Sequence, residues 1–85
     1  MFTSMAEQYW VVGRKRNDTV EWTTSAMARP TTRIEWTHDR ALAHKFDDEF
    51  SAAGACKNIV ECSFGRQNET TEEELFIDPP ISWTL

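Results

Sequence analysis

Along residues 8–16, successive side chains would fall alternately on two faces of an extended chain, and apolar residues occur on both faces. This pattern is typical of a β-strand. Trp10 and Val12 fall on one face of this expected strand, and Tyr9 and Val11 fall on the other. We therefore predict a β-strand here, with Trp10 and Val12 directed into the core of the protein.

A second alternating stretch, over residues 20–24, follows the pair Asn17-Asp18, whose residue types tolerate the positive φ of a tight turn. Two alternating stretches joined by such a pair predict a β-hairpin. Residues 32–36 alternate again after a connector that contains Pro30, a residue that disfavours helix in the position before it. We therefore predict a third strand after the hairpin.

A helix is predicted to begin at Thr37, a favourable N-cap residue, with Asp39 in its first turn where the helix dipole favours negative charge. It is predicted to end at Gly54, or a little later at Lys57-Asn58. Its apolar face would comprise four residues at spacings of four, four and three, namely Leu42, Phe46, Phe50 and Ala53.

Two further alternating stretches, over residues 60–64 and 72–77, predict a second hairpin, which two prolines would stop. Residues 81–85 alternate once more and predict a short last strand. The order β-β-β-α-β-β defines an α+β fold, a single antiparallel β-sheet of about five strands with one amphipathic helix packed on one face. We predict one domain over residues 1–85, with residues 1–7 as a loose tail.

The outer face of this sheet is expected to be exposed, because one helix covers only one face. The tetrapeptides VEWT and IEWT recur in the second and third stretches and place Trp22 and Trp36 together on the buried face. Tyr9 and Val11 would then lie on the uncovered face. Such an apolar patch is an interface candidate, for a partner or for a second copy of the chain as a homodimer.

Acidic residues gather in the second half of the chain. Residues 1–45 hold seven Lys and Arg against five Asp and Glu, whereas residues 46–85 hold two against nine. These carboxylates indicate either a solvated face or a contact surface for a basic partner, such as a nucleic-acid-binding protein. The predicted partner-binding residues are Asp47, Asp48, Glu49, Glu69, Glu72, Glu73 and Glu74, together with Tyr9 and Val11.

Nucleic-acid binding is the alternative hypothesis. Phosphate contacts need clustered cations, and this chain offers one cluster, at the tip of the first hairpin. A charged hairpin tip also keeps a sheet edge soluble without binding anything. The residues of this alternative site are Arg14, Lys15, Arg16 and Arg33.

Catalytic and metal-binding motifs are not evident in the sequence, so we predict neither an enzyme nor a cofactor. His38 and His44 are six residues apart, as are Cys56 and Cys62, whereas zinc ligands usually come in closer pairs. A small enzyme or metal protein that uses His44 and Cys62 is the remaining hypothesis of this class. No leader or membrane-spanning stretch is expected, which predicts a cytoplasmic protein.

In outline the chain resembles small accessory proteins of bacteriophages. The resemblance spans about residues 8–60 and consists of a hairpin that begins YWVV, followed by IEWT leading into an alanine- and phenylalanine-containing helix. It implies a non-enzymatic protein that binds and inhibits or modulates a host protein or defence complex in the host cytoplasm. It assigns no function to any residue.

Overall fold

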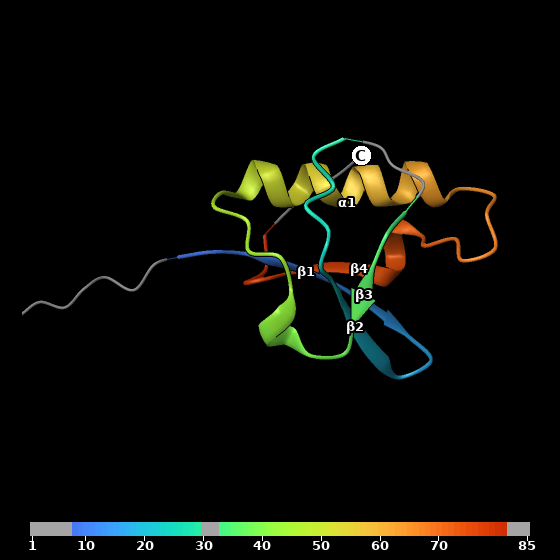
Figure 1. Ribbon diagram of the computed structural model, residues 1–85, viewed down its shortest axis with the longest axis horizontal. Helices are drawn as coiled ribbons and strands as arrows, with labels where there is room; N and C mark the ends of the chain where they lie inside the picture. Colours follow the sequence, from blue (N-terminus) through green and yellow to red (C-terminus); the bar gives the residue numbers. More distant parts are fainter. Residues whose placement is uncertain (1–7, 30–32, 82–85) are drawn as a thin grey trace, which may run out of the picture.

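The computed structural model describes residues 8–29 and 33–81 (Figure 1). In these ranges one α-helix packs on a four-stranded antiparallel sheet of order β3-β2-β1-β4, so the predicted α+β class is confirmed. The elements are β1 (Val11–Arg16), β2 (Thr19–Thr23), β3 (Trp36–Thr37), the 3₁₀ turn η1 (Arg40–Leu42), α1 (Glu49–Ser63), the 3₁₀ turn η2 (Glu72–Glu74) and β4 (Leu75–Asp78).

The first hairpin is confirmed. β1 and β2 pair in antiparallel register, with Arg16 opposite Thr19, so two residues make the turn. These are Asn17 and Asp18, at φ of 53° and 66°. Positive φ at both central residues suits the right-handed twist of the flanking strands, which is why this residue pair is favoured there.

The predicted helix start at Thr37 is wrong, because Thr37 belongs to β3 and α1 begins at Glu49. Asp48 caps α1 by accepting a hydrogen bond from the backbone N–H of Ser51 at 2.7 Å. Asp39 caps η1 instead, through Ala41 N–H at 3.0 Å. The predicted apolar face fails too, because Leu42 and Phe50 are exposed; the buried face of α1 consists of Ala52, Ala55, Cys56, Ile59 and Ser63.

The predicted strand over residues 60–64 is also wrong, since residues up to Ser63 form the last turns of α1. Gly65, at φ of 74°, then turns the chain away from the helix. β4 consequently pairs with β1 rather than with a neighbouring strand in sequence. The sheet has four strands in the described ranges, not five, and the predicted strand over 81–85 and the tail over 1–7 fall largely outside those ranges.

The core lies between α1 and one face of the sheet. Val12 and Ile77 face each other across β1 and β4 and contact the small residues of the helix. Small helix residues let the helix backbone approach the sheet closely, so a thin domain still excludes water. The buried cluster comprises Val12, Met27, Phe46, Ala52, Ala55, Cys56, Ile59, Leu75 and Ile77.

Trp22 and Trp36 lie on opposite faces of the sheet, contrary to prediction. Thr23 pairs with Trp36, and Trp22 pairs with Thr37. The two tryptophans therefore occupy adjacent, not opposite, positions in the register of β2 and β3. Since side chains alternate along a strand, Trp36 faces the side of α1 and Trp22 faces away from it.

The sheet face opposite α1 is covered, so the predicted exposed patch is wrong. The rings of Trp22 and Phe76 meet edge to face at 5.3 Å, and Arg40 lies 5.5 Å from the Trp22 ring centroid. Figure 1 shows η1 on the side of the sheet away from α1. Val11 is only 1% exposed under this cover, and Tyr9 is half-buried. This face is covered because the segment that contains η1, predicted from the sequence to be part of the helix, crosses to this side of the sheet.

Candidate functional site

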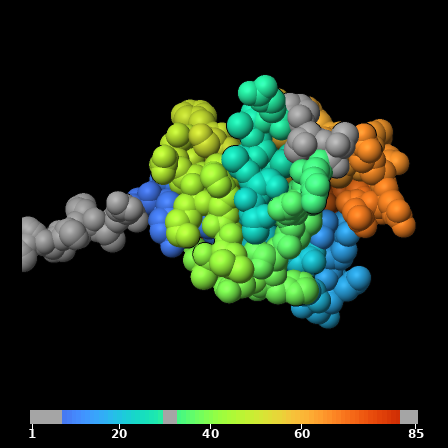
Figure 2. Space-filling model, in the orientation of Figure 1, coloured from blue at the N-terminus to red at the C-terminus, as the bar shows by residue number. Residues whose placement is uncertain are grey.

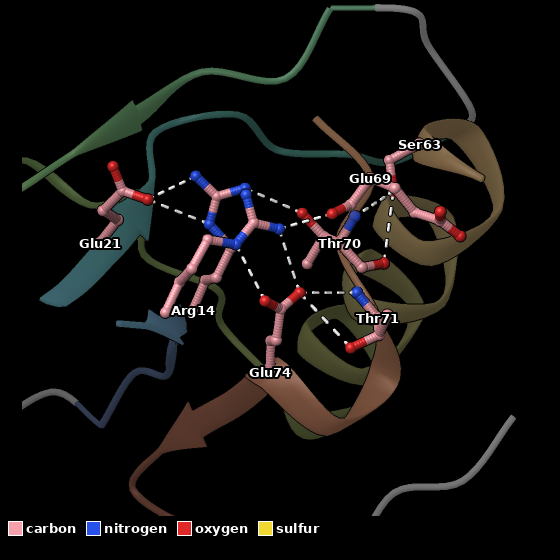
Figure 3. Close-up of polar contacts among 8 residues, drawn as sticks. Arg14, Glu21, Ser63, Glu69, Thr70, Thr71 and Glu74 are labelled. Atoms are coloured by element: carbon pink, nitrogen blue, oxygen red, sulfur yellow. Dashed lines mark hydrogen bonds and ion pairs between the residues drawn. The ribbon is translucent and has the colours of Figure 1, made fainter. Parts of the chain in front are cut away.

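A buried arginine links β1 to β2 and to the loop after α1 (Figure 3). The guanidinium of Arg14 donates through Nε and Nη2 to one carboxylate oxygen of Glu21, the former at 3.0 Å, and through Nη1 to Thr70 Oγ1 at 2.9 Å. It also lies 4.0 Å from the ring centroid of Trp36. Its side chain is 8% exposed. The guanidinium of Arg14 is therefore engaged in contacts within the fold and is not available to bind a partner.

Arg16 makes a second ion pair on the same side of β1. Its Nε and Nη2 donate to the two carboxylate oxygens of Glu74 at 2.9 and 3.1 Å, and Nη2 also donates to the carbonyl of Glu69. Glu74 in turn accepts from Thr71 N–H at 2.9 Å. Hydrogen bonds from Arg16 lower the pKa of Glu74 from its ordinary 4.5 to about 2. This pair fixes η2 against the end of β1.

We expect acid to remove the stabilisation that Glu74 provides. Its pKa is lower in the folded protein, so the stabilisation is present above about pH 4.5 and is lost as the pH falls toward 2. The difference in melting temperature between wild type and Glu74→Gln should therefore be largest at pH 7 and narrow steadily as the pH falls from about 4.5 to 2. Glu73→Gln, on the same turn, is the control and should leave the pH dependence unchanged. A constant gap between wild type and Glu74→Gln would contradict the assignment.

The predicted nucleic-acid site does not form a free basic surface. Arg14 and Arg16 are paired as described, and Arg33 pairs with Glu35 at 3.3 Å. Of the four predicted cations, Lys15 is exposed and makes no ion pair with another residue of the ranges 8–29 and 33–81. Because phosphate binding needs several uncommitted cations, the structure gives this alternative little support.

The predicted acidic surface separates into two regions. Glu69 and Glu74 interact with Arg16, and near them Glu72 and Glu73 lie exposed on η2. The second region is the acidic triplet, which we define as Asp47, Asp48 and Glu49 at the start of α1; all three are exposed, and Asp48 is also the N-cap.

An apolar groove lies beside the acidic triplet, between the first turns of α1 and the segment 26–28. Its volume is about 370 Å³. In the space-filling view the surface is hollowed between these two segments, drawn in yellow-green and teal (Figure 2). The groove is lined by Ala26, Met27, Ala28, His44, Phe46, Phe50, Ser51, Gly54, Ala55 and Asn58.

Phe50 is the most exposed large apolar side chain among the described residues, at 89%. The sequence pattern placed it in the core because its spacing from Phe46 fits a helix, so the groove was missed. Once α1 is known to begin at Glu49, Phe50 falls on the face opposite Ala52 and Cys56.

The two cysteines and His44 each lie in surroundings of their own within the described residues. Burial raises the pKa of the Cys56 thiol to about 12, so it stays protonated and is a poor nucleophile. Cys62 donates its thiol hydrogen to the carbonyl of Asn58, and His44 packs edge to face on Phe46 at 4.6 Å. Among the described residues no three His, Cys, Asp or Glu side chains gather as a metal site.

The described residues thus define a small α+β protein whose most distinctive surface is an apolar groove with an acidic rim. Comparison with protein-family models, curated proteins and solved structures finds no match to this chain. No helix within residues 8–29 and 33–81 is long and apolar enough to cross a bilayer.

Proposed function

We propose that this chain is a small non-enzymatic protein that binds and modulates another protein through the apolar groove and the acidic triplet. The observation that supports this proposal is Phe50, a large aromatic side chain left 89% exposed at the edge of the groove. Exposed aromatic anchors beside a pocket, with a polar rim, are typical of residues that dominate binding energy at protein interfaces.

The acidic triplet supports a partner whose own surface is basic. Asp47, Asp48 and Glu49 lie in sequence between two groove residues, Phe46 and Phe50, so their charges are adjacent to the apolar contact. Negative potential there accelerates encounter with a basic surface and disfavours acidic ones. The resemblance to phage accessory proteins favours a host protein as this partner, inhibited by occupation of its basic surface.

We expect Phe50→Ala to abolish capture of the partner. Immobilised protein would be exposed to host lysate, with and without nuclease, and the retained proteins identified. Loss of an interface hot spot weakens binding by about 2 kcal/mol, roughly thirtyfold. Phe64→Ala is the matched control, because Phe64 is also exposed, at 75%, but lies after the other end of α1 and outside the groove.

The two variants and the nuclease treatment separate the hypotheses. A protein retained by wild type and Phe64→Ala, and lost with Phe50→Ala, would support the proposal. Equal retention by all three proteins would contradict it. Retention that disappears on nuclease treatment would favour nucleic-acid binding instead.

A further inference from the structure

Gly54 leaves a notch in the wall of the groove. It lies one helical turn after Phe50, and a Cβ atom built on it would meet nothing within 4 Å. Its backbone is ordinary helix, with no positive φ that would require glycine. Alanine is favoured over glycine inside a helix. Neither internal packing nor backbone conformation therefore accounts for glycine at this position, whereas a close approach from outside would.

Two of the three polar side chains that line the groove, Ser51 and Asn58, donate hydrogen bonds within the protein, and the third, His44, packs its ring on Phe46. Asn58 donates through its amide to the carbonyl of Met27 at 2.7 Å, and the Ser51 hydroxyl donates to the Asp48 carboxylate at 3.2 Å. A polar group entering the groove would find few hydrogen bonds to replace those it loses with water. The part of an occupant that enters the groove is therefore apolar.

The two ends of the groove differ in charge. The acidic triplet and Lys45, which together carry a net charge of −2, adjoin the groove at Phe46 and Phe50, while Lys57 lies one turn beyond Gly54 and Arg29 directly follows Ala28. An occupant that carries its cations at one end fits this arrangement in one direction. A second copy of the chain is the competing occupant, because a two-fold contact would lay the acidic triplet of one copy against the end of the other copy that carries Lys57 and Arg29; the oligomeric state is therefore tested below.

We infer that the groove binds a basic amphipathic segment of the partner protein, an inference that rests on the proposed function. Aliphatic side chains of this segment enter between Phe50 and Met27, and its backbone crosses α1 at the notch left by Gly54. Lys or Arg side chains at one end of the segment pair with Asp47 and Glu49. The volume of about 370 Å³ fits a few side chains, as in helix-in-groove recognition.

Three labelled synthetic helical peptides test this inference by fluorescence anisotropy. The first has leucines along one face and lysines at one end, the second replaces those lysines with glutamates, and the third replaces the leucines with alanines. We expect the Lys–Leu peptide to bind, with an affinity that falls as salt is added, and the other two to bind at least about tenfold more weakly.

Variants of the protein locate the contact. We expect the double variant Asp47→Asn with Glu49→Gln to bind the Lys–Leu peptide about tenfold more weakly than wild type, because two ion pairs at the rim would be lost. The matched control is Glu72→Gln with Glu73→Gln, which removes the same charge from η2 and should change nothing. Gly54→Gln fills the notch and should weaken binding about tenfold without lowering the melting temperature, because glutamine favours helix.

Each other outcome overturns the inference. Failure of the Lys–Leu peptide to bind, equal binding of the Glu–Leu or Lys–Ala peptide, or an unchanged affinity for Gly54→Gln would do so. A dimer in light scattering that Phe50→Ala abolishes would assign the groove to a second copy. If the lysate protein still depends on Phe50 while the Lys–Leu peptide fails, the proposed function stands and the partner chemistry is wrong; if neither binds, both fail.

Discussion

Replacing Glu21 by glutamine is expected to lower the free energy of unfolding by about 3 kcal/mol, near the lower end of the range for breaking a buried ion pair. Glu21 receives two hydrogen bonds from Arg14, whose side chain is 8% exposed. Glutamine would leave that guanidinium charge buried without a negative partner, in contact with a neutral amide oxygen, Thr70 and the ring of Trp36. Most of the lost stability comes from burying the guanidinium charge of Arg14 without a negative partner, and less of it from the lost attraction itself.

Urea unfolding of three variants beside wild type tests this reasoning. The double variant Arg14→Met with Glu21→Leu removes both charges, and we expect it to be far closer to wild type than Glu21→Gln. Glu35→Gln is the control, since its pair with Arg33 is exposed at 57% and 84% and should change stability by less than about 0.5 kcal/mol. A double variant as unstable as Glu21→Gln would mean that packing around Arg14 matters more than its charge.

Gly13→Val is expected to lower the free energy of unfolding by about 2 kcal/mol through overpacking. A Cβ on Gly13 would lie 2.5 Å from the far carbon of the Phe76 ring and 2.9 Å from Cε3 of Trp22. Both rings lie across this glycine on the sheet face opposite α1. Valine favours strands in general, so a loss of stability here would come from the clash with the rings.

A double-mutant cycle isolates the clash. In a Phe76→Leu background the smaller side chain leaves room, so Gly13→Ala should cost less there than in wild type. Gly54→Ala is the contrasting control, expected to raise stability by up to about 1 kcal/mol because its Cβ meets nothing. Equal costs of Gly13→Ala in the two backgrounds would contradict the aromatic contact.

Local patterns predicted the first hairpin and the α+β class, because turn residues and strand alternation act over a few positions. The helix was misplaced because Leu42, Phe46 and Phe50 have helical spacing by coincidence. The real helix buries Ala52, Ala55 and Cys56, which carry a weak hydrophobic signal. Small residues become a core face only when a sheet lies against them, and sequence pattern does not reveal that contact.

The pairing of the arginines in β1 was harder to predict, because it depends on which face of the strand each side chain occupies. Arg14 stands two residues after Val12 and so shares its helix-facing side, a signal that the alternation itself contained. The run of three basic residues suggested a solvent-exposed cluster instead. The groove is not predictable from the sequence pattern, because the spacing of Phe50 from Phe46 favours a core position and Gly54 is a residue type typical of a helix end.

The unequal distribution of charge along the chain has a consequence for how the protein assembles. Arg14 and Arg16 of the basic first hairpin contact Thr70, Glu69 and Glu74 of the acidic second half, across 53 to 58 residues of sequence. Attraction between the two halves therefore guides the last segment onto a hairpin that can form early from local contacts. Folding should accordingly slow as ionic strength rises, even where the native state loses little stability.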